Sequence, residues 1–264
     1  MNQNATYFLK FDTGASTHVG KVRQANEDSF VVVPEVGLWA VADGVGGHEA
    51  GQMASQTVAS ALATVGPAVS AEDQMARFQE RLLRANDRIR EYADERGGGL
   101  VGTTVAAILV YDWQFRVAWA GDSRVYLIRN GSITQISRDH SEVQELVDQG
   151  FIKPEEAKSW PRRNVITRAI GIFDDLYIDV REGRIEPGDI FLLCSDGLTG
   201  HVTDGEIRDM VGDKRSQDVC DSLINLTLDR GATDNVSIVV VRCHRAERTN
   251  FIPGNSSGEA QASS

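Results

Sequence analysis

Four aspartates stand at the ends of apolar runs that are typical of buried strands. Asp43 follows LWAVA, Asp122 follows VAWAG, Asp196 follows IFLLCS, and Asp234 lies just before VSIVVV. A carboxylate in such a place is costly to desolvate unless a cation or hydrogen bonds stabilise it. If one fold brings the four together they repel one another, and an oxygen-binding divalent cation is the simplest remedy. The pattern therefore predicts a metal centre assembled from strand ends.

The residue types favour a hard cation at this centre. Carboxylates without cysteines or paired histidines indicate magnesium or manganese rather than zinc. Glycine follows Asp43 and Asp196, and we expect it to let the backbone turn sharply and present a carbonyl. Asp43 is the best candidate to bridge two ions, with the carbonyl of Gly44 bound to one of them. Two ions about 4 Å apart lower the pKa of a water bound between them. They also stabilise the attacking and leaving oxygens when that water displaces a group at phosphorus.

An acidic site that acts on a phosphate also needs a cationic side chain. Arg23, shortly before Glu27 and Asp28, is the leading candidate because a guanidinium matches phosphate oxygens in bidentate fashion. Taken alone, Arg23 is more simply a surface arginine, and any single Asp-Gly pair is equally weak evidence because such pairs are common in turns. The prediction therefore rests on the whole set.

Composition excludes several function classes. The chain has 264 residues, 41% of them hydrophobic and 25% charged, which is typical of one globular domain. Its net charge of -11 argues against a nucleic-acid partner, because binding to a phosphate backbone needs a basic face. The three cysteines are scattered, no run reaches membrane-spanning length, and the N-terminus lacks a signal-peptide pattern. We expect a cytoplasmic monomer without membrane association.

Helical periodicity predicts four helices. Residues 49–65 are small and apolar, as expected for a helix packed closely on a sheet. A long amphipathic helix begins at Ser70, a favourable N-cap, and ends at a triple glycine. Thr203 and Glu206 form a capping box for a short helix, and a last helix is expected over 216–231.

Strand-like runs account for most of the remaining apolar residues. In chain order they are 29–33, 38–42, 103–110, 115–120, 123–129, 132–136, 190–195 and 236–243. The Asn130-Gly131 pair between two of these runs is a strong signal for a tight hairpin, so antiparallel pairing is expected. Helices outside a pair of packed antiparallel sheets would bury all of these faces, which predicts an α+β fold.

Two segments differ from this pattern. Residues 139–171 contain a cap at Ser141 and short helical pieces broken by glycine and proline, which predicts a mobile surface segment. Residues 248–264 are rich in serine and glycine, and we expect a disordered tail there. The folded domain is therefore expected to span residues 1–247.

The ordered motifs RQANED, ADGVGG, GTT, AGDSR, CSDGL and ATDNVS extend over nearly the whole chain. In this order they closely resemble the metal-dependent PP2C-type (PPM) serine/threonine protein phosphatases, particularly the compact bacterial branch. The resemblance implies an αββα sandwich of two packed antiparallel sheets flanked by helices, with a two-metal site at one edge. It also implies hydrolysis of phosphoserine and phosphothreonine in protein substrates by a metal-activated water, in opposition to a bacterial serine/threonine kinase.

The resemblance assigns roles residue by residue. The family's ligands to two manganese or magnesium ions fall on Asp43, the carbonyl of Gly44, Asp196 and Asp234. Asp28 takes the place of an acidic neighbour that orders metal-bound waters, and Arg23 takes the phosphate-binding position. In bacterial members a third metal is held partly by the aspartate of GDSR, here Asp122, together with the aspartate of SDG. Residues 139–171 fall where the family has its variable flap.

One departure concerns the proton donor. Animal members carry a histidine directly after the Asp-Gly pair, proposed as general acid, whereas this chain has Val45. His48 lies nearby in the sequence, but a role in proton transfer depends first on geometry. A metal-bound water can serve instead. His140, in RDHS beside the expected flap, is predicted to make a structural hydrogen bond.

Two alternatives remain open at this point. A regulatory phosphatase that acts on a phosphoserine of an anti-sigma-factor antagonist would be marked by a fused sensor domain, and none of these 264 residues suggests one. A non-catalytic binding module would be expected to have lost ligand aspartates, whereas all of them are present. Turnover of a chromogenic phosphate ester with and without manganese separates an enzyme from a binding module.

Overall fold

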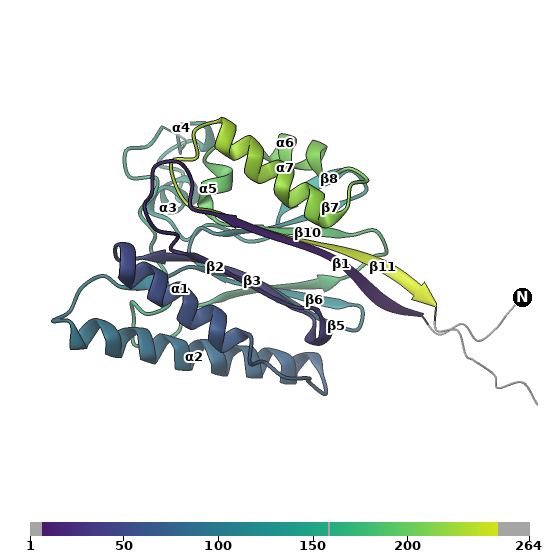
Figure 1. Cartoon of the computed structure of the whole chain (residues 1–264), viewed down its shortest axis with the longest axis horizontal. Helices are drawn as coiled ribbons and strands as arrows, with labels where there is room; N and C mark the ends of the chain where they lie inside the picture. The colour runs from purple at the N-terminus through teal and green to yellow at the C-terminus, as the bar shows by residue number, and fades with distance from the viewer. Residues whose placement is uncertain (1–6, 158, 248–264) are drawn as a thin grey trace, which may run out of the picture.

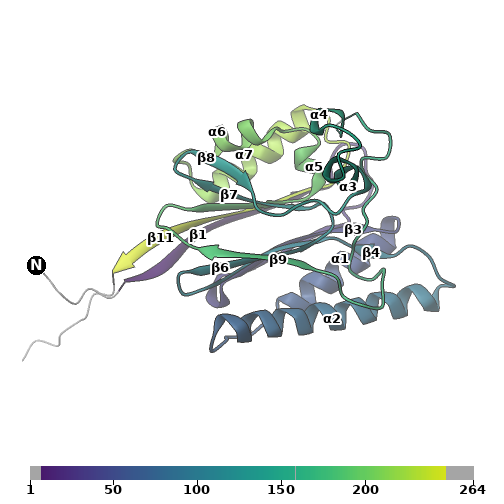
Figure 2. The same cartoon turned by 180° about the vertical axis from the view of Figure 1, so that it is seen from behind.

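Four layers make up the fold. The computed structural model describes residues 7–157 and 159–247, so the predicted tail, residues 248–264, lies outside the described residues. Two antiparallel sheets pack face to face, and helices cover the outer face of each (Figure 1). The view from behind shows the same order of layers, with α2 along one outer face and α6 and α7 along the other (Figure 2). The predicted αββα sandwich of the α+β class is confirmed.

Each sheet has five strands in its main path, and all neighbouring strands are antiparallel. Across the first sheet the strands are β1 (Tyr7–His18), β11 (Val236–Glu247), β10 (Ile190–Cys194), β7 (Arg124–Arg129) and β8 (Ser132–Gln135). Across the second they are β2 (Asp28–Val33), β3 (Leu38–Val45), β5 (Val105–Tyr111), β6 (Gln114–Ala120) and β9 (Asp179–Arg184). A short strand, β4 (Gly102–Thr103), pairs with the end of β3.

The long helices are divided between the two faces. On the second sheet lie α1 (His48–Leu62) and α2 (Ala71–Glu95); on the first lie α6 (Asp204–Val211) and α7 (Ser216–Asp229). Shorter elements are η1 (Pro34–Val36), α3 (Glu142–Asp148), α4 (Pro154–Ala157) and α5 (Asp196–Thr199). Both α3 and α4 fall within the predicted flap, which confirms its short helical pieces.

Local capping explains where several helices begin. The Ser70 hydroxyl accepts a hydrogen bond from the Asp73 N–H at 3.1 Å, and Ser141 caps α3 in the same way. At α6 the reciprocal capping box of Thr203 and Glu206 is complete. Each such cap satisfies N–H groups that the first turn of a helix leaves without intrahelical partners, which contributes about 1 kcal/mol. All three helix starts match the sequence prediction.

The main core between the sheets is aromatic and β-branched. Trp39 and Phe191 are fully buried there, with Val239 and Val241 from the interior strand β11. The Phe191 ring meets Phe115 of the opposite sheet edge-on, at 5.0 Å between centroids. Burial of one such side chain contributes about 1.5–3 kcal/mol, so this layer holds the two sheets together. It thereby sets how the strand ends of the two sheets are placed relative to each other.

Two edge strands were not predicted from the sequence. β1 pairs along its whole length with β11, more than 200 residues further along the chain, and its residues are mostly half-exposed. β9 (DVREGR) is charged and largely exposed. On the open side of β1 the Gln217 amide accepts from the Ala15 N–H at 3.1 Å and donates to the Ala15 carbonyl at 3.2 Å, as a neighbouring strand would. This contact protects an edge that would otherwise invite pairing with another chain.

Phe191→Ala tests the aromatic contact between the sheets. We expect a loss of about 3–5 kcal/mol in the free energy of unfolding, because truncation leaves a cavity beside Phe115. Denaturant unfolding followed by tryptophan fluorescence measures it, with Phe8→Ala at an exposed position as the matched control. A loss below about 1 kcal/mol would contradict this description of the core.

Candidate active site

The structure brings the predicted carboxylates to one edge of the sandwich. Asp43 lies near the end of β3, Asp196 opens α5 directly after β10, and Asp122 lies in the turn between β6 and β7. Asp234 precedes β11, and Asp28 begins β2, where it is paired across the ladder with Asp43. Four of the five line one pocket of about 170 Å³; Asp28 does not line it and is buried. Both sheets therefore contribute acidic groups to a single site.

The GTT motif fixes the backbone of Asp43. The Asp43 N–H donates to the Thr104 hydroxyl at 2.9 Å, and the Asp43 carbonyl accepts from the Thr104 N–H at 2.8 Å and from the Thr103 hydroxyl at 2.9 Å. The Thr104 hydroxyl also lies 2.7 Å from the Ser123 hydroxyl, next to Asp122. These threonines therefore tie two acidic strand ends together, a role that the sequence analysis did not assign to them.

The two Asp-Gly glycines allow close backbone approach. A Cβ on Gly44 would lie 2.1 Å from the Gly51 carbonyl oxygen at the first turns of α1, and one on Gly197 would lie 1.8 Å from the Asn235 carbonyl oxygen. Neither glycine has a left-handed φ. We expected glycine at these two positions because it lets the backbone turn sharply. That explanation is wrong for both Gly44 and Gly197. Glycine is required because another backbone passes within contact distance.

Asp28 provides an acceptor without a partner. Its Oδ2 accepts a hydrogen bond from the Ser195 hydroxyl at 2.7 Å, and that hydroxyl also accepts from the Ser237 N–H. Its buried Oδ1 finds no hydrogen-bond partner among the described residues. A buried carboxylate oxygen without a donor is costly, and it fits a site that receives a cation or an ordered water.

Burial and mutual repulsion hold the carboxyls toward their neutral form. Burial raises the pKa of Asp43 well above its usual range, and the charges of Asp28 and Asp196 raise it further. Burial likewise raises the pKa of Asp122 well above its usual range, with a further contribution from Asp196. Burial also raises the pKa of Asp28 and of Asp196, and in both cases repulsion by Asp234 adds to the shift. A divalent cation would reverse these shifts by favouring the ionised forms.

The carboxylates share a pocket but are not preassembled around an ion. Among residues 7–157 and 159–247, no three acidic, histidine or cysteine side chains converge closely enough to hold a metal as they stand. Asp234 is instead paired with Arg23, whose Nη2 lies 2.7 Å from Asp234 Oδ2. The donor set consists of oxygen ligands suited to a hard cation, and binding would require side-chain rotation and release of Asp234 from Arg23.

Asn235 is a site residue that the sequence analysis missed. Its amide nitrogen donates to the carbonyls of Val19 and Ala25 at 2.8 and 3.0 Å, and its oxygen accepts from the Glu27 N–H at 2.8 Å. These three bonds fix the loop that carries Arg23 against the turn that carries Asp234. The pattern ATDN contained the residue, but its partners lie more than 200 positions away.

The flap and the position after Gly44 also contribute to the pocket. Asn164 and Ile166, from the predicted flap, line it together with Val45, so the position at which animal members carry histidine is apolar here. His48 begins α1. The structural role predicted for His140 is confirmed, because its Nδ1 accepts from the Gly121 N–H at 3.3 Å and its Nε2 lies 3.2 Å from Asp179 Oδ2.

Two packed antiparallel sheets with carboxylates gathered at their shared edge are the arrangement expected of the family that the sequence motifs resemble. Residues 15–146 match the family described as protein phosphatase 2C, and residues 149–244 match the family described as stage II sporulation protein E (SpoIIE). The chain belongs to the protein phosphatase 2C family.

Individual relatives agree with this assignment. The chain is 41% identical over 223 residues to the serine/threonine protein phosphatase PstP of Mycobacterium tuberculosis, covering 84% of this chain but only 43% of that protein. The solved structure of PppA, described as a key regulatory component of T6SS in Pseudomonas aeruginosa, superimposes with a TM-score of 0.83 at 39% identity, covering 90% of this chain and all of that one. The catalytic domain of PstP in complex with two manganese ions gives a TM-score of 0.80 at 35% identity, with the same coverage.

Thermal unfolding with and without manganese tests the cation requirement of the cluster. A cation that lets the carboxylates ionise stabilises the folded state by about 2.7 kcal/mol at 100 times its Kd, so Tm should rise by roughly 5–10 °C. Asp43→Asn should abolish most of that rise, whereas Asp218→Asn, at a half-exposed carboxylate on α7 outside the pocket, should leave it intact. Equal Tm values for the wild-type protein in manganese and in chelator would contradict the cation site.

Proposed function

We propose that this chain is a metal-dependent protein serine/threonine phosphatase that hydrolyses phosphoserine and phosphothreonine. The observation that carries the proposal is the convergence of acidic strand ends from both sheets on one small pocket beside Arg23. Family membership supports it, since relatives that match over most of this chain are named serine/threonine phosphatases. A non-catalytic module would have no need to retain five mutually repelling carboxylates.

Two manganese or magnesium ions are the cofactors in this proposal, and the two ions bound to the PstP catalytic domain support it. Asp43, the Gly44 carbonyl, Asp196 and Asp234 would hold them, and Asp122 with Asp196 would hold a third. When bound, such ions supply a nucleophilic water at neutral pH and neutralise charge on the phosphoryl oxygens. In this proposal the unpartnered oxygen of Asp28 accepts a hydrogen bond from a water at the centre, and its lack of another partner supports that role.

Arg23 is the proposed phosphate-binding residue. Its side chain is half-exposed, lines the pocket, and in this structure donates to the carboxylate of Asp234. A guanidinium that satisfies a carboxylate in this way can satisfy a phosphoryl group with the same donors. If a cation binds Asp234, Arg23 loses that partner, so binding of metal and readiness for an anionic substrate are linked.

The proton donor for the leaving alcohol is not supplied by the position after Gly44. Val45 lines the pocket and has no proton to give, and Ile166, another lining residue, is also apolar. Their apolar side chains would reduce the polarity of this part of the pocket, which strengthens electrostatic interactions there. The leaving serine or threonine would therefore take its proton from water held at the centre.

The partners in this proposal are phosphorylated proteins, and a serine/threonine kinase would supply them. The net charge of -11 argues against nucleic acid as substrate, and we propose a monomer that acts in the cytoplasm. Within the described part of the chain, no helix has both the length and the apolar content to span a membrane. Phosphoproteins from cells that lack this protein, compared with those from the wild type, would identify the substrates.

Asp43→Asn, Asp196→Asn and Asp234→Asn should each reduce turnover of a phosphothreonine peptide by at least about 100-fold, because each removes a proposed metal ligand. Released inorganic phosphate measures the rate, with manganese present or removed by a chelator. Asp218→Asn serves as the control and should behave as wild type. Full wild-type turnover in chelator would contradict the metal-dependent mechanism.

Arg23→Ala should raise KM by roughly tenfold or more while kcat changes less, because a phosphate contact is lost and the metal ligands remain. Steady-state kinetics on a small phosphate ester measure both constants. The neighbouring Lys21→Ala removes a charge of the same sign outside the pocket and is the matched control. An unchanged KM in the Arg23 variant would remove this residue from the site.

Asp122→Asn should lower kcat at limiting manganese while calorimetry still detects the two stronger binding events. The reason is that loss of one carboxylate weakens a peripheral ion more than one that Asp43 bridges. If Asp122 only stabilises its turn, asparagine replaces it with little loss. Wild-type turnover at limiting metal would support that simpler role.

A further inference from the structure

The turn that carries Asp122 has a demanding backbone. This turn, Gly121–Arg124, joins β6 to β7. Gly121 has a φ of 106°, and a Cβ there would lie 2.5 Å from Thr104 Cγ2. Glycine adopts such a φ readily, whereas a residue with a side chain would be strained and would clash with Thr104, so the turn depends on glycine at this position. His140 and Asp139 bind the backbone and side chain on either side of Asp122.

His140 holds the peptide before Asp122. Its backbone N–H donates to the Gly121 carbonyl at 2.9 Å, and its ring Nδ1 accepts from the Gly121 N–H at 3.3 Å. Because Nδ1 acts as an acceptor, the ring proton belongs on Nε2, which lies 3.2 Å from Asp179 Oδ2. The ring is buried and stacks on Trp119 at 6.0 Å between centroids. Both backbone polar groups of Gly121, its N–H and its carbonyl, are thus bound by one residue.

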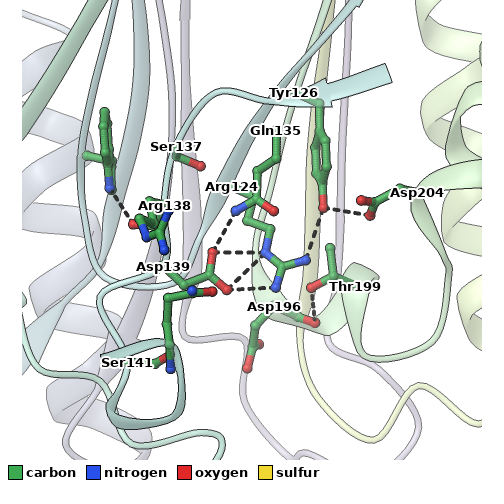
Figure 3. Close-up of polar contacts among 12 residues, drawn as sticks. Arg124, Tyr126, Gln135, Ser137, Arg138, Asp139, Ser141, Asp196, Thr199 and Asp204 are labelled. Carbon is green, nitrogen blue, oxygen red and sulfur yellow. Dashed lines mark hydrogen bonds and ion pairs between the residues drawn. The ribbon is translucent and has the colours of Figure 1, made fainter. Parts of the chain in front are cut away.

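Asp139 holds the other side of the turn. Arg124 Nε lies 3.0 and 3.1 Å from its two carboxylate oxygens, and Arg124 Nη2 lies 2.6 Å from Oδ2 (Figure 3). The Gln135 amide donates to Asp139 Oδ1 at 2.8 Å, and Arg124 Nη1 lies 3.1 Å from the Tyr126 hydroxyl. Figure 3 shows the guanidinium between Asp139 and Tyr126, on the side of the site where Asp196 lies. A bidentate pair in this setting fixes orientation as well as charge.

The same short segment is also the base of the flap. Residues 138–140, which we call the stem, lead directly into Ser141, the N-cap of α3. The His140 carbonyl accepts from the Thr167 N–H at 2.8 Å on the returning side of the flap, and Ser141 forms a β-bridge with Ile166. Ile166 lines the carboxylate pocket. The stem therefore contacts the Asp122 turn and both ends of the flap.

We propose that Asp139 and His140 are positioning residues for Asp122, and that through them the base of the flap and the Asp122 carboxylate are held as one unit. Neither residue lines the pocket, so each acts through the turn. The proposal rests on the proposed phosphatase function only for its effect on turnover. The placement of the Asp122 carboxylate, which can bind a cation, is measured without any substrate.

A matched set of variants separates positioning from stability. His140→Asn can retain an acceptor for the Gly121 N–H, whereas His140→Gln places its amide nearer Asp179 and gives up the Gly121 contact. Asp139→Asn removes the charge that pairs with Arg124. The control is Asp189→Asn at the far end of β7, where Asp189 is buried and accepts from Arg129 Nε and Nη2, both at 2.7 Å.

Each variant of the 264-residue chain is titrated with manganese in a calorimeter. In separate samples with chelator, Tm is measured and hydrogen exchange is followed at the Gly121 and Asp122 amides. Partners of ligand residues typically change metal affinity 10–100-fold, so the weakest manganese event should weaken by about tenfold or more in Asp139→Asn and His140→Gln. His140→Asn should bind the weakest manganese ion with an affinity closer to that of the wild type, and its Gly121 and Asp122 amides should be protected from exchange to a similar degree. Asp189→Asn should lower Tm and leave the titration unchanged.

Three results would overturn the proposal. One is a wild-type titration curve in both Asp139→Asn and His140→Gln, and another is an equal loss of the weak event in Asp189→Asn. The third is the absence in the wild-type protein of any manganese event that Asp122→Asn removes. Turnover of a phosphothreonine peptide by the same samples is read separately: a wild-type protein that binds manganese as described but releases no phosphate would refute the proposed function and leave the positioning role standing.

Discussion

The structure depends most on repulsion among buried and half-buried carboxylates that the fold brings together. Strand ends from both sheets deliver Asp28, Asp43 and Asp196 to one edge, and burial raises the pKa of each. Without a cation these groups oppose folding, because they must be either charged and repelling or neutral and desolvated. The aromatic layer between the sheets and the hydrogen bonds around the pocket offset that cost. Because a cation favours the ionised carboxylates, the stability of a site of this kind should respond to a bound ion.

Several features could be predicted because their signals are local. The Asn130-Gly131 turn requires two successive positive φ angles, and the structure has them at 51° and 76°. The capping residues Ser70, Ser141 and Thr203 lie within three positions of the N–H groups that they satisfy. Apolar runs ending in aspartate indicated where acidic groups would gather, because antiparallel strands place alternate ends at one edge. Order of the motifs then indicated the family.

Other features could not be predicted because their partners are distant in the chain. β1 is recognisable as a strand only beside β11, and Asn235 has its role only because the loop of Val19 and Ala25 packs against it. The pairing of Arg23 with Asp234 is likewise a contact across more than 200 residues. For Gly44 and Gly197 the residue type was noticed but its reason was wrong, since the requirement comes from a second backbone rather than from the local turn.

The central claim is that this carboxylate edge is a binuclear metal centre, and the most direct measurement is anomalous scattering from crystals of the protein grown with manganese. We expect two manganese peaks in the pocket, both contacted by Asp43, with Asp196 and Asp234 as further ligands and Arg23 released from Asp234. Crystals that show no manganese in this pocket at saturating concentration, with the Arg23–Asp234 pair intact, would contradict it.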